Sequence, residues 1–328
     1  MGHVDDEIAS QPDCWRQAAI LAAGPAADAL PRQGERVAVV GCGTSWFMAM
    51  AYAGLREAAG HGETDAFQAS EFPAGRRYDR ILAITRSGTT TEILDLLAAV
   101  PDRTPSTVIL GDPDSPAAHP ATRTDPDPGS GSGSGSGSGR AIVALPFADE
   151  RSVVQTRFAT SALALLRAHL GTDVTALAAD AEVAVRAPLP VDPAEVEQVT
   201  FLGRGWTAGL AQEAALKCRE AAGFWSEAYP TMDYRHGPIA IAAPGRLVWA
   251  FGEISDRLAE EISNTGAAFA HSRTNGAYGV LGTWTAGRPA LDPMADLILA
   301  QRFAVALAAG RGLDPDRPRN LTRSVVLA

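Results

Sequence analysis

The chain has 328 residues, of which 46% are hydrophobic and 20% are charged, so it can bury one large core or two modest ones. At roughly 150 residues per domain, this length predicts about two domains. The 28 basic and 38 acidic side chains give a formal net charge of −10, which argues against a nucleic-acid or anionic-membrane partner. We expect no apolar run long enough to span a bilayer, which takes roughly 18 to 20 residues, and the N-terminus is acidic. We therefore expect a cytoplasmic protein.

The cysteines and lysines limit the chemistry that the chain can perform. Cys14, Cys42 and Cys218 are far apart and odd in number, so we expect free thiols rather than a disulfide framework or a CxxC metal site. Lys217 is the single lysine among the 28 basic residues. Because an arginine side chain cannot form a Schiff base, any side-chain imine would have to form at this one position.

Aliphatic and β-branched runs alternate with helical patterns in the first half of the chain. The expected strands cover residues 36–40, 80–84, 106–111 and 141–147, and the expected helices cover residues 46–59 and 93–100. This alternation is typical of a parallel, doubly wound α/β sheet. A Gly/Ser repeat at 125–139 interrupts it; such a repeat behaves as a flexible coil, and it is either a natural insertion or an engineered loop.

The second half of the chain resembles the first. Residues 199–207 resemble the first strand and its glycine turn at an offset of 162, and residues 247–262 resemble the next strand and helix at an offset of about 166. We therefore predict two α/β/α units in tandem, each a flavodoxin-like parallel sheet. The expected divisions are a helical cap at 1–30, a phosphate-binding unit at 31–185, a second unit at 190–310, and a tail over the active site at 311–328.

Two turns in the first half are rich in hydroxyl groups. Their side chains are Thr44, Ser45, Ser87, Thr89 and Thr90. Hydroxyl groups at a helix N-terminus suit a phosphate monoester, because backbone N–H groups and the helix dipole add to them. The alternative is that these residues only cap their helices. The corresponding turn of the second half, residues 252–256, is acidic, so we expect one anion site per chain.

No nucleotide-binding motif accompanies these turns. The glycines at 41 and 43 lack the third glycine of a dinucleotide fingerprint, and there is no GxxxxGKS/T sequence. Further along the chain, Glu213, Lys217 and Glu220 are spaced to share one helical face and to pair. Spacing alone favours a solvated helix with an ordinary salt bridge. An exposed or hydrogen-bonding histidine is also common at a turn such as the one at His236, before Gly-Pro.

Several motifs together resemble the sugar isomerase (SIS) family, and most closely the isomerase half of glucosamine-6-phosphate synthase with its aminosugar-phosphate deaminase and ketose/aldose isomerase relatives. These motifs are CGTS at 42–45, ASEF at 69–72, TRSGTTTE at 85–92, ERSVVQT at 150–156, ALKCRE at 215–220, SEAY at 226–229, YRHGP at 234–238 and DRPRNLTRSV at 316–325. They occur in the family's order over most of residues 36–328, which makes the resemblance far more specific than any single motif.

The resemblance implies a role for individual residues. The implied phosphate and sugar ligands are Thr44, Ser45, Ser87, Thr90 and Val153, with Arg86 where the synthase has glutamine and Gln155 where it has serine. Glu220 matches the base that moves a proton between C1 and C2 of the open-chain sugar, and Lys217 matches an active-site lysine. His236 matches the histidine that opens the sugar ring, which in relatives reaches the site from a neighbouring subunit. The resemblance therefore implies a homodimer with shared sites.

Two departures from the synthase change the expected reaction. The synthase begins with a glutaminase domain, whereas this chain starts just before the sugar domain, so we expect no glutamine-dependent activity from this chain alone. Near the C-terminus, Arg323 replaces a lysine that forms a Schiff base with the ketose. Arg323 can instead hold a hydroxyl or oxyanion electrostatically.

The expected function is isomerisation of a phosphorylated sugar, most plainly an aminosugar 6-phosphate, with or without deamination. Glu220 would be the base and His236 the ring-opening group, and Arg323 or Lys217 would steady the enediolate. No metal or redox cofactor is expected. The alternative is a noncatalytic phosphosugar-binding sensor or regulator: the replacement by Arg323 favours it, while the presence of both Glu220 and His236 argues against it.

Overall fold

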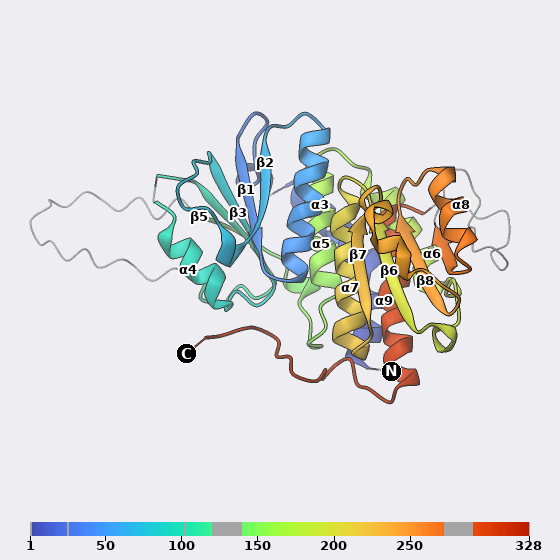
Figure 1. Cartoon of the computed structure of the whole chain (residues 1–328). Coiled ribbons are helices and arrows are strands. Elements are labelled where there is room, and N and C mark those ends of the chain that lie inside the picture. Colours follow the sequence, from blue (N-terminus) through green and yellow to red (C-terminus); the bar gives the residue numbers. More distant parts are fainter. Residues whose placement is uncertain (1, 25, 102, 120–139, 272–290, 328) are drawn as a thin grey trace, which may run out of the picture.

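The computed structural model describes residues 2–24, 26–101, 103–119, 140–271 and 291–327. The Gly/Ser repeat at 125–139 lies outside the described residues. Within them the chain forms two parallel sheets at opposite ends of the molecule, with long helices between (Figure 1). The expected fold class, two parallel α/β units in tandem, is confirmed.

The first sheet has five parallel strands in the order β2-β1-β3-β4-β5. The strands are β1 (Val37–Gly41), β2 (Thr64–Gln68), β3 (Arg80–Thr85), β4 (Ser106–Leu110) and β5 (Arg140–Ala144). Every residue of β1, β3 and β4 is buried, which explains their near-continuous apolar sequences. β2 lies on one side of β1 and the later strands lie on the other, so the order in which strands are added to the sheet reverses between β1 and β3. Ligands of open α/β sheets bind at such a switch point.

The second sheet repeats this arrangement with four parallel strands in the order β7-β6-β8-β9. The strands are β6 (Gln198–Gly203), β7 (Ser226–Pro230), β8 (Arg246–Phe251) and β9 (Ala268–His271). Strands β2 and β7 begin at residues 64 and 226, and strands β4 and β9 begin at residues 106 and 268. Corresponding strands therefore lie about 162 residues apart, which agrees with the internal repeat seen in the sequence.

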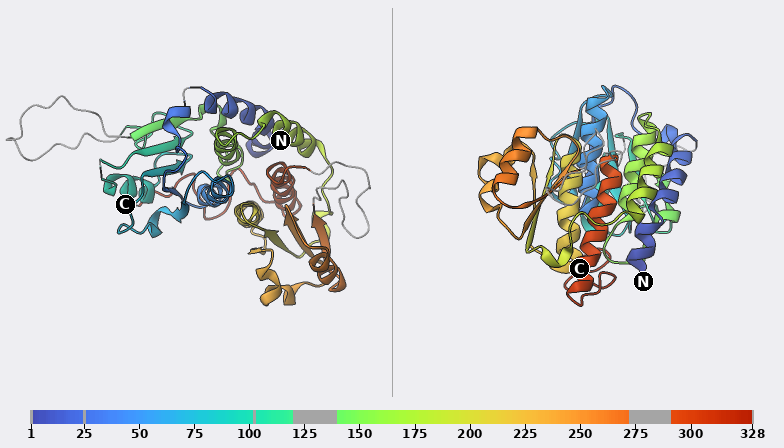
Figure 2. Two further views of the ribbon diagram at one scale, coloured as in Figure 1. Left: turned by 90° about the horizontal axis from the view of Figure 1, so that it is seen from above. Right: turned by 90° about the vertical axis from the view of Figure 1, so that its right-hand side faces the viewer.

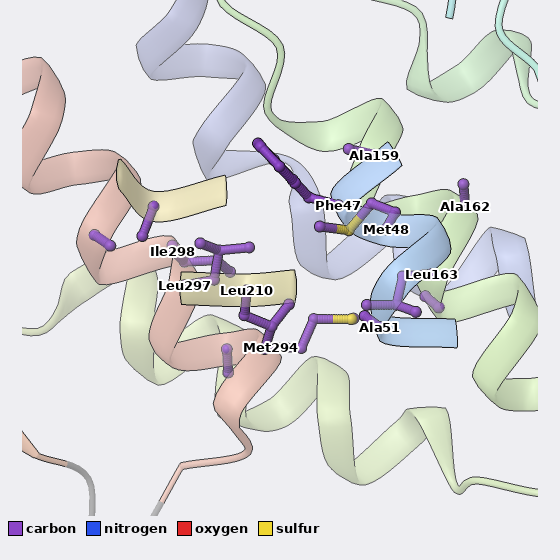
Figure 3. Packing of buried hydrophobic residues seen from close by; sticks show 14 of the residues in the cluster. Phe47, Met48, Ala51, Ala159, Ala162, Leu163, Leu210, Met294, Leu297 and Ile298 are labelled. Atoms are coloured by element: carbon purple, nitrogen blue, oxygen red, sulfur yellow. The ribbon is translucent and has the colours of Figure 1, made fainter. Parts of the chain in front are cut away.

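Helices from both halves pack together in one central core. Helix α3 (Thr44–Ala58) packs against α5 (Arg157–His169) and α7 (Thr207–Ala222), and α7 also packs against α9 (Pro293–Gly310). Figure 2 shows these helices between the sheets, and Figure 3 shows their interdigitated side chains. Fully buried residues such as Met48, Leu163, Leu210 and Leu297 join the two halves in this core.

The remaining helices cover the outside of the molecule. Helices α1 (His3–Ala9), α2 (Gln11–Ala22) and α6 (Val174–Arg186) lie along one side, with α2 against α5 and α6. Helix α4 (Thr91–Ala99) lies beside the first sheet, and α8 (Asp256–Asn264) lies beside the second (Figure 1). After α9 the chain runs as an extended tail back past α1 toward α4 (Figure 1).

One glycine in each repeat permits the tight connection from strand to helix. A Cβ atom at Gly41 would lie 2.6 Å from the backbone of Ser45, and one at Gly203 would lie 2.2 Å from the backbone of Thr207. Real Cβ atoms do not approach so closely, so only glycine fits at the ends of β1 and β6. These two glycines bring the first turns of α3 and α7 against the ends of their strands.

Helix α9 is long and apolar enough to cross a membrane by length and composition, contrary to the expectation from the sequence that no segment is. However, 67% of its apolar window is buried inside the protein, against α7 and other helices. It is therefore a core helix of a globular fold. The free cysteines behave as expected, because Cys14 and Cys218 are buried and Cys42 is partly buried.

Candidate active site

A small cavity of about 200 Å³ opens at the carboxyl ends of β1 and β3. The first turns of α3 and α4, the loop at 150–156, the end of α7 and the C-terminal tail form its walls. The sequence-predicted site residues that line it are Thr44, Ser45, Arg86, Ser87, Thr90, Val153, Gln155, Glu220 and Arg323. Segments more than 200 residues apart in the chain thus meet at the sheet edge where the fold favours ligand binding.

The hydroxyl groups at this edge are not used as helix caps. Thr90 occupies the N-cap position of α4 and Gly43 that of α3, and neither helix has a side-chain cap hydrogen bond. The hydroxyls of Ser45, Ser87 and Thr90 instead belong to residues that line the cavity. An anion in the cavity would therefore find hydroxyl donors beside two helix N-termini.

Thr89 contacts its neighbours rather than the cavity. Its hydroxyl lies 2.9 Å from the Ser87 hydroxyl and 2.8 Å from the Ser324 hydroxyl, and its backbone N–H donates to Ser87 at 3.2 Å. Thr89 is absent from the cavity wall. It therefore orients Ser87 and joins the hydroxyl loop to the tail.

Lys217 lies at the centre of a buried charge cluster on α7. Its Nζ atom is 2.5 Å from Oε2 of Glu220, 3.4 Å from Oε1 of Glu213 and 3.0 Å from the hydroxyl of Thr44. The side chains of Lys217 and Glu213 are 1% exposed, whereas Glu220 is 21% exposed and faces the cavity. This is not the solvated helix that the spacing also allowed.

Burial and charge set the ionisation of this cluster. Burial raises the pKa of Glu213 to about 7, although the Lys217 ammonium opposes the rise. For Lys217, burial would lower the pKa, but the carboxylates of Glu213 and Glu220 outweigh it and the net pKa is raised. Lys217 is therefore an ammonium at neutral pH. Its side chain does not line the cavity. It holds one oxygen of Glu220 and leaves that side chain facing the ligand space.

The tail carries Arg323 into the cavity wall together with its neighbours. Leu321, Thr322, Ser324 and Val325 also line the cavity. The guanidinium of Arg323 pairs with the carboxylate of Asp149, and both side chains are partly exposed. Arg323 thus lies in the cavity wall with its charge balanced by a carboxylate.

His236 lies outside this cavity in the single chain. It ends a short 3₁₀ helix (Asp233–His236) after β7, and its side chain is exposed. It does not line the cavity wall. His236 is thus a predicted catalytic residue that the fold of a single chain leaves on the surface and away from the cavity.

Two polar atoms in the cavity wall have no hydrogen-bond partner within the described part of the chain. They are Oε2 of Glu92, in the first turn of α4, and Nε2 of Gln155. A buried polar atom without a partner is costly unless a ligand or water satisfies it. The Gln155 amide therefore offers a donor, and Glu92 an acceptor, to a polar ligand.

Cys42 also lines the cavity, but it is not a nucleophile at neutral pH. Burial and the nearby carboxylate of Glu92 raise the pKa of its thiol to about 11.

Two further residues, the buried carboxylates Glu213 and Glu150, have sequence patterns too weak to predict their burial near the site. Glu213 shares the face of Lys217, which spacing shows, but its burial depends on the packing of α7 against α3 and α9. Glu150 lies in the ERSVVQT motif, and nothing in its spacing predicts a buried carboxylate.

The chain is similar in sequence to glutamine–fructose-6-phosphate aminotransferases. It is 28% identical over 316 residues to the isomerizing aminotransferase of Methanothermobacter thermautotrophicus, which covers 89% of this chain and 52% of that protein. A shorter alignment with the Aeropyrum pernix aminotransferase has 34% identity over 139 residues, 39% of this chain and 22% of that protein. The chain thus spans about half the length of the curated relatives it matches most fully. No protein-family model matches it.

Solved structures show the same fold over nearly the whole chain. A glucosamine-6-phosphate deaminase from Thermotoga maritima superimposes with a TM-score of 0.74 at 24% identity, covering 99% of this chain and 100% of that one. The C-terminal domain of the Francisella tularensis glucosamine–fructose-6-phosphate aminotransferase gives a TM-score of 0.77 at 21% identity, covering 97% and 98%. The resemblance expected from the motifs is confirmed by these sequence relatives and by this shared fold.

Proposed function

We propose that this chain, which has the fold of the sugar isomerases and resembles the isomerase part of the aminotransferases, is a phosphosugar isomerase or isomerising deaminase. Its substrate would be an aminosugar 6-phosphate bound in the cavity at the ends of β1 and β3. The observation that carries the proposal is the Lys217–Glu220 pair, 2.5 Å apart, which presents a carboxylate to a cavity lined by hydroxyl-bearing residues. We also propose that the protein acts in the cytoplasm.

The phosphate would bind to Thr44, Ser45, Ser87 and Thr90 and to the N-terminus of α4. Hydroxyl and backbone donors at a helix start satisfy three phosphate oxygens without a metal ion. The cavity of about 200 Å³ is below the usual range for drug-sized ligands, which suits a monosaccharide phosphate. Val153 and the unpartnered amide of Gln155 would contact the sugar itself.

Glu220 would remove the proton from C2 of the open-chain aldose and return it to C1. The proton leaving C2 creates an enediolate, or an enolamine when C2 bears nitrogen, and reprotonation at C1 gives the ketose or its imine. The fructosimine then reacts with water and releases ammonia and the ketose phosphate. Lys217 would orient the carboxylate of Glu220, and Arg323 would stabilise the negative oxygen.

Ring opening requires a second acid or base, which His236 would provide from a partner subunit. Its exposed position away from the cavity of its own chain supports this arrangement. No lysine occupies position 323, and the ammonium of Lys217 is buried and paired, so the proposed reaction proceeds without an imine to the protein. The arginine at position 323 also favours the second candidate, a noncatalytic phosphosugar sensor.

Proton NMR in D2O tests the proposal and separates the two candidates. The protein is incubated with glucosamine 6-phosphate, with fructose 6-phosphate plus ammonium, and with other hexose 6-phosphates. Deuterium entering C1 or C2, with ketose or ammonia formed, is the expected result. Saturable binding of a phosphosugar without exchange would establish the sensor, and absence of binding to every sugar phosphate would overturn both.

A further inference from the structure

Arg86 follows β3 directly in the hydroxyl loop, yet it is 7% exposed and its guanidinium contacts protein acceptors. Nη1 lies 3.4 Å from Oε2 of Glu150 and donates to the backbone carbonyls of Ser152 and Val153, each at 3.2 Å. Nη2 donates to the same Val153 carbonyl at 3.3 Å. Both terminal nitrogens are therefore occupied by the loop that forms one wall of the cavity.

Glu150 is the buried anchor for this arginine. Its carboxylate accepts hydrogen bonds from the backbone N–H of Thr156 at 2.5 Å and of Arg157 at 2.7 Å, and from the Thr156 hydroxyl at 3.0 Å. It therefore ties the loop to the start of α5, and its side chain has no exposed surface. Burial raises its pKa, while the charge of Arg86 acts in the opposite direction.

The same guanidinium reaches the C-terminal tail. Nη2 of Arg86 donates to the backbone carbonyl of Arg323 at 2.8 Å, which is the shortest of its hydrogen bonds. The next two residues of the tail are also bonded to the hydroxyl loop and α4: Ser324 bonds Thr89, and the carbonyl of Val325 accepts from the backbone N–H of Thr91 at 3.2 Å. A charged donor makes a stronger hydrogen bond than these neutral groups do.

We propose that Arg86 is a positioning residue that holds residues 323–325 of the tail across the hydroxyl loop and so closes the cavity, rather than a ligand of the phosphate. This inference rests on the proposed function only in its consequence for the substrate. Arg86 joins three separate segments: the loop after β3, the loop at 150–153 and the tail. Because both terminal nitrogens already donate to protein acceptors, little donor capacity remains for a phosphate.

Hydrogen exchange measures this role without any substrate. The backbone N–H of Leu327 donates to the hydroxyl of Thr91 at 2.9 Å, so its exchange reports whether the tail is attached. In Arg86→Gln, peptides covering residues 321–327 should exchange roughly ten- to a hundredfold faster, the range for loss of one hydrogen bond to a charged group. The matched control is Asp149→Asn, which removes only the partly exposed pair with the Arg323 side chain and should leave this exchange nearly unchanged.

Two further variants keep the test valid if Arg86→Gln folds poorly. Arg86→Lys retains a charge for Glu150 but lacks the planar fork, so it should fold and still exchange rapidly at the tail. The double variant Arg86→Gln with Glu150→Gln removes both buried charges and should behave likewise. Unchanged exchange at 321–327 in the folded variants would overturn the proposal.

The effect on the substrate separates this inference from the proposed function. If both hold, the folded Arg86 variants should raise KM for glucosamine 6-phosphate and should lower kcat less than Glu220→Gln does, because the released tail carries Arg323 away while Glu220 stays in place. A wild-type protein that binds no sugar phosphate would refute the proposed function while the exchange result still decided the role of Arg86. An equal loss of affinity for glucosamine 6-phosphate and inorganic phosphate, with tail exchange unchanged, would instead make Arg86 a phosphate ligand.

Discussion

The two halves of the molecule share one framework of strands and helices and differ in the hydrogen bonds that the hydroxyl groups of their turns make. Thr44 and Thr207 begin corresponding helices after Gly41 and Gly203. The hydroxyl of Thr207 accepts from the N–H of Arg204 at 2.8 Å and lies 3.0 Å from the carbonyl of Phe251, so its own half uses it. The hydroxyl of Thr44 instead accepts from Lys217 of the other half and lies at the cavity.

The second turn of each half shows the same contrast. Ser255 caps α8 in the ordinary way, because its side chain accepts from the N–H of Leu258 at 3.3 Å. Thr90 holds the corresponding position before α4 and makes no such cap bond. The proposed site thus lies in the half where Thr90 makes no cap hydrogen bond, whereas the corresponding serine of the other half stabilises its own helix.

The largest expected effect is that of replacing Glu220, the carboxylate that the second half contributes to the cavity of the first half. Glu220→Gln should lower the rate of C2 proton exchange by about 10² to 10⁴, the usual contribution of a general base. Binding of glucosamine 6-phosphate should change little, because Gln keeps the shape and still contacts Lys217. Deuterium exchange by NMR and calorimetric binding measure the two properties. Full activity in this variant would remove Glu220 from its proposed role.

Replacing Ser87 and Thr90 together by alanine should weaken binding of sugar phosphates strongly. Each lost hydrogen bond to a charged group is worth about 1.5 to 3 kcal/mol, which is more than tenfold in affinity. The free sugar should lose little. Calorimetry with glucosamine 6-phosphate and with glucosamine measures the difference, and an equal loss for both would show that this loop does not bind phosphate.

Two buried carboxylates of the second half differ in whether a cation lies beside them. Burial raises the pKa of each to about 7, but Glu213 has Lys217 as a partner, whereas one oxygen of Asp296 in α9 has no partner among the described residues. The native state then holds a proton that the unfolded state loses near the ordinary value of 3.8, so the free energy of unfolding should fall as pH rises from about 4 to 7.

Asp296→Asn should therefore be more stable than the wild type at pH 8 and should lose less stability between pH 5 and pH 8. Urea denaturation at the two pH values measures both quantities. A variant that follows the wild-type pH dependence would show that Asp296 is ionised in the native state.

The smallest expected effect is in the second half. Ser255→Ala removes the cap of α8 and should cost about 1 kcal/mol of stability, within the range for N-cap serines. It should leave binding of glucosamine 6-phosphate unchanged, which makes it the matched control for the Ser87 and Thr90 variants. A loss of phosphosugar affinity in this variant would contradict the assignment of binding to the first half alone.

The sequence predicted the framework well where its pattern was strong. The buried strands β1, β3, β4 and β8 have near-continuous apolar runs. The predicted repeat is confirmed by the strand orders β2-β1-β3-β4 and β7-β6-β8-β9, which correspond strand by strand. The edge strands β2 and β7 were not predicted, because their residues are mostly half-exposed and polar residues interrupt them. Edge strands are specified by their neighbours more than by their own composition.

The sequence predicted the members of the site better than their contacts. Motifs indicated nine residues that line one cavity, but spacing cannot show whether a side chain faces the ligand or another segment. Arg86 illustrates this, since its partners Glu150 and Arg323 are 64 and 237 residues away in the chain. Thr89 likewise bonds Ser324, a contact that only the folded tail creates.

The number of sugar-phosphate sites per chain tests the central claim most directly. Calorimetric titration of the wild-type protein with glucosamine 6-phosphate should give one site per chain, and the Ser87 and Thr90 double variant should lose it while Ser255→Ala keeps it. Two equal sites per chain, or one site that survives in the double variant, would contradict the account.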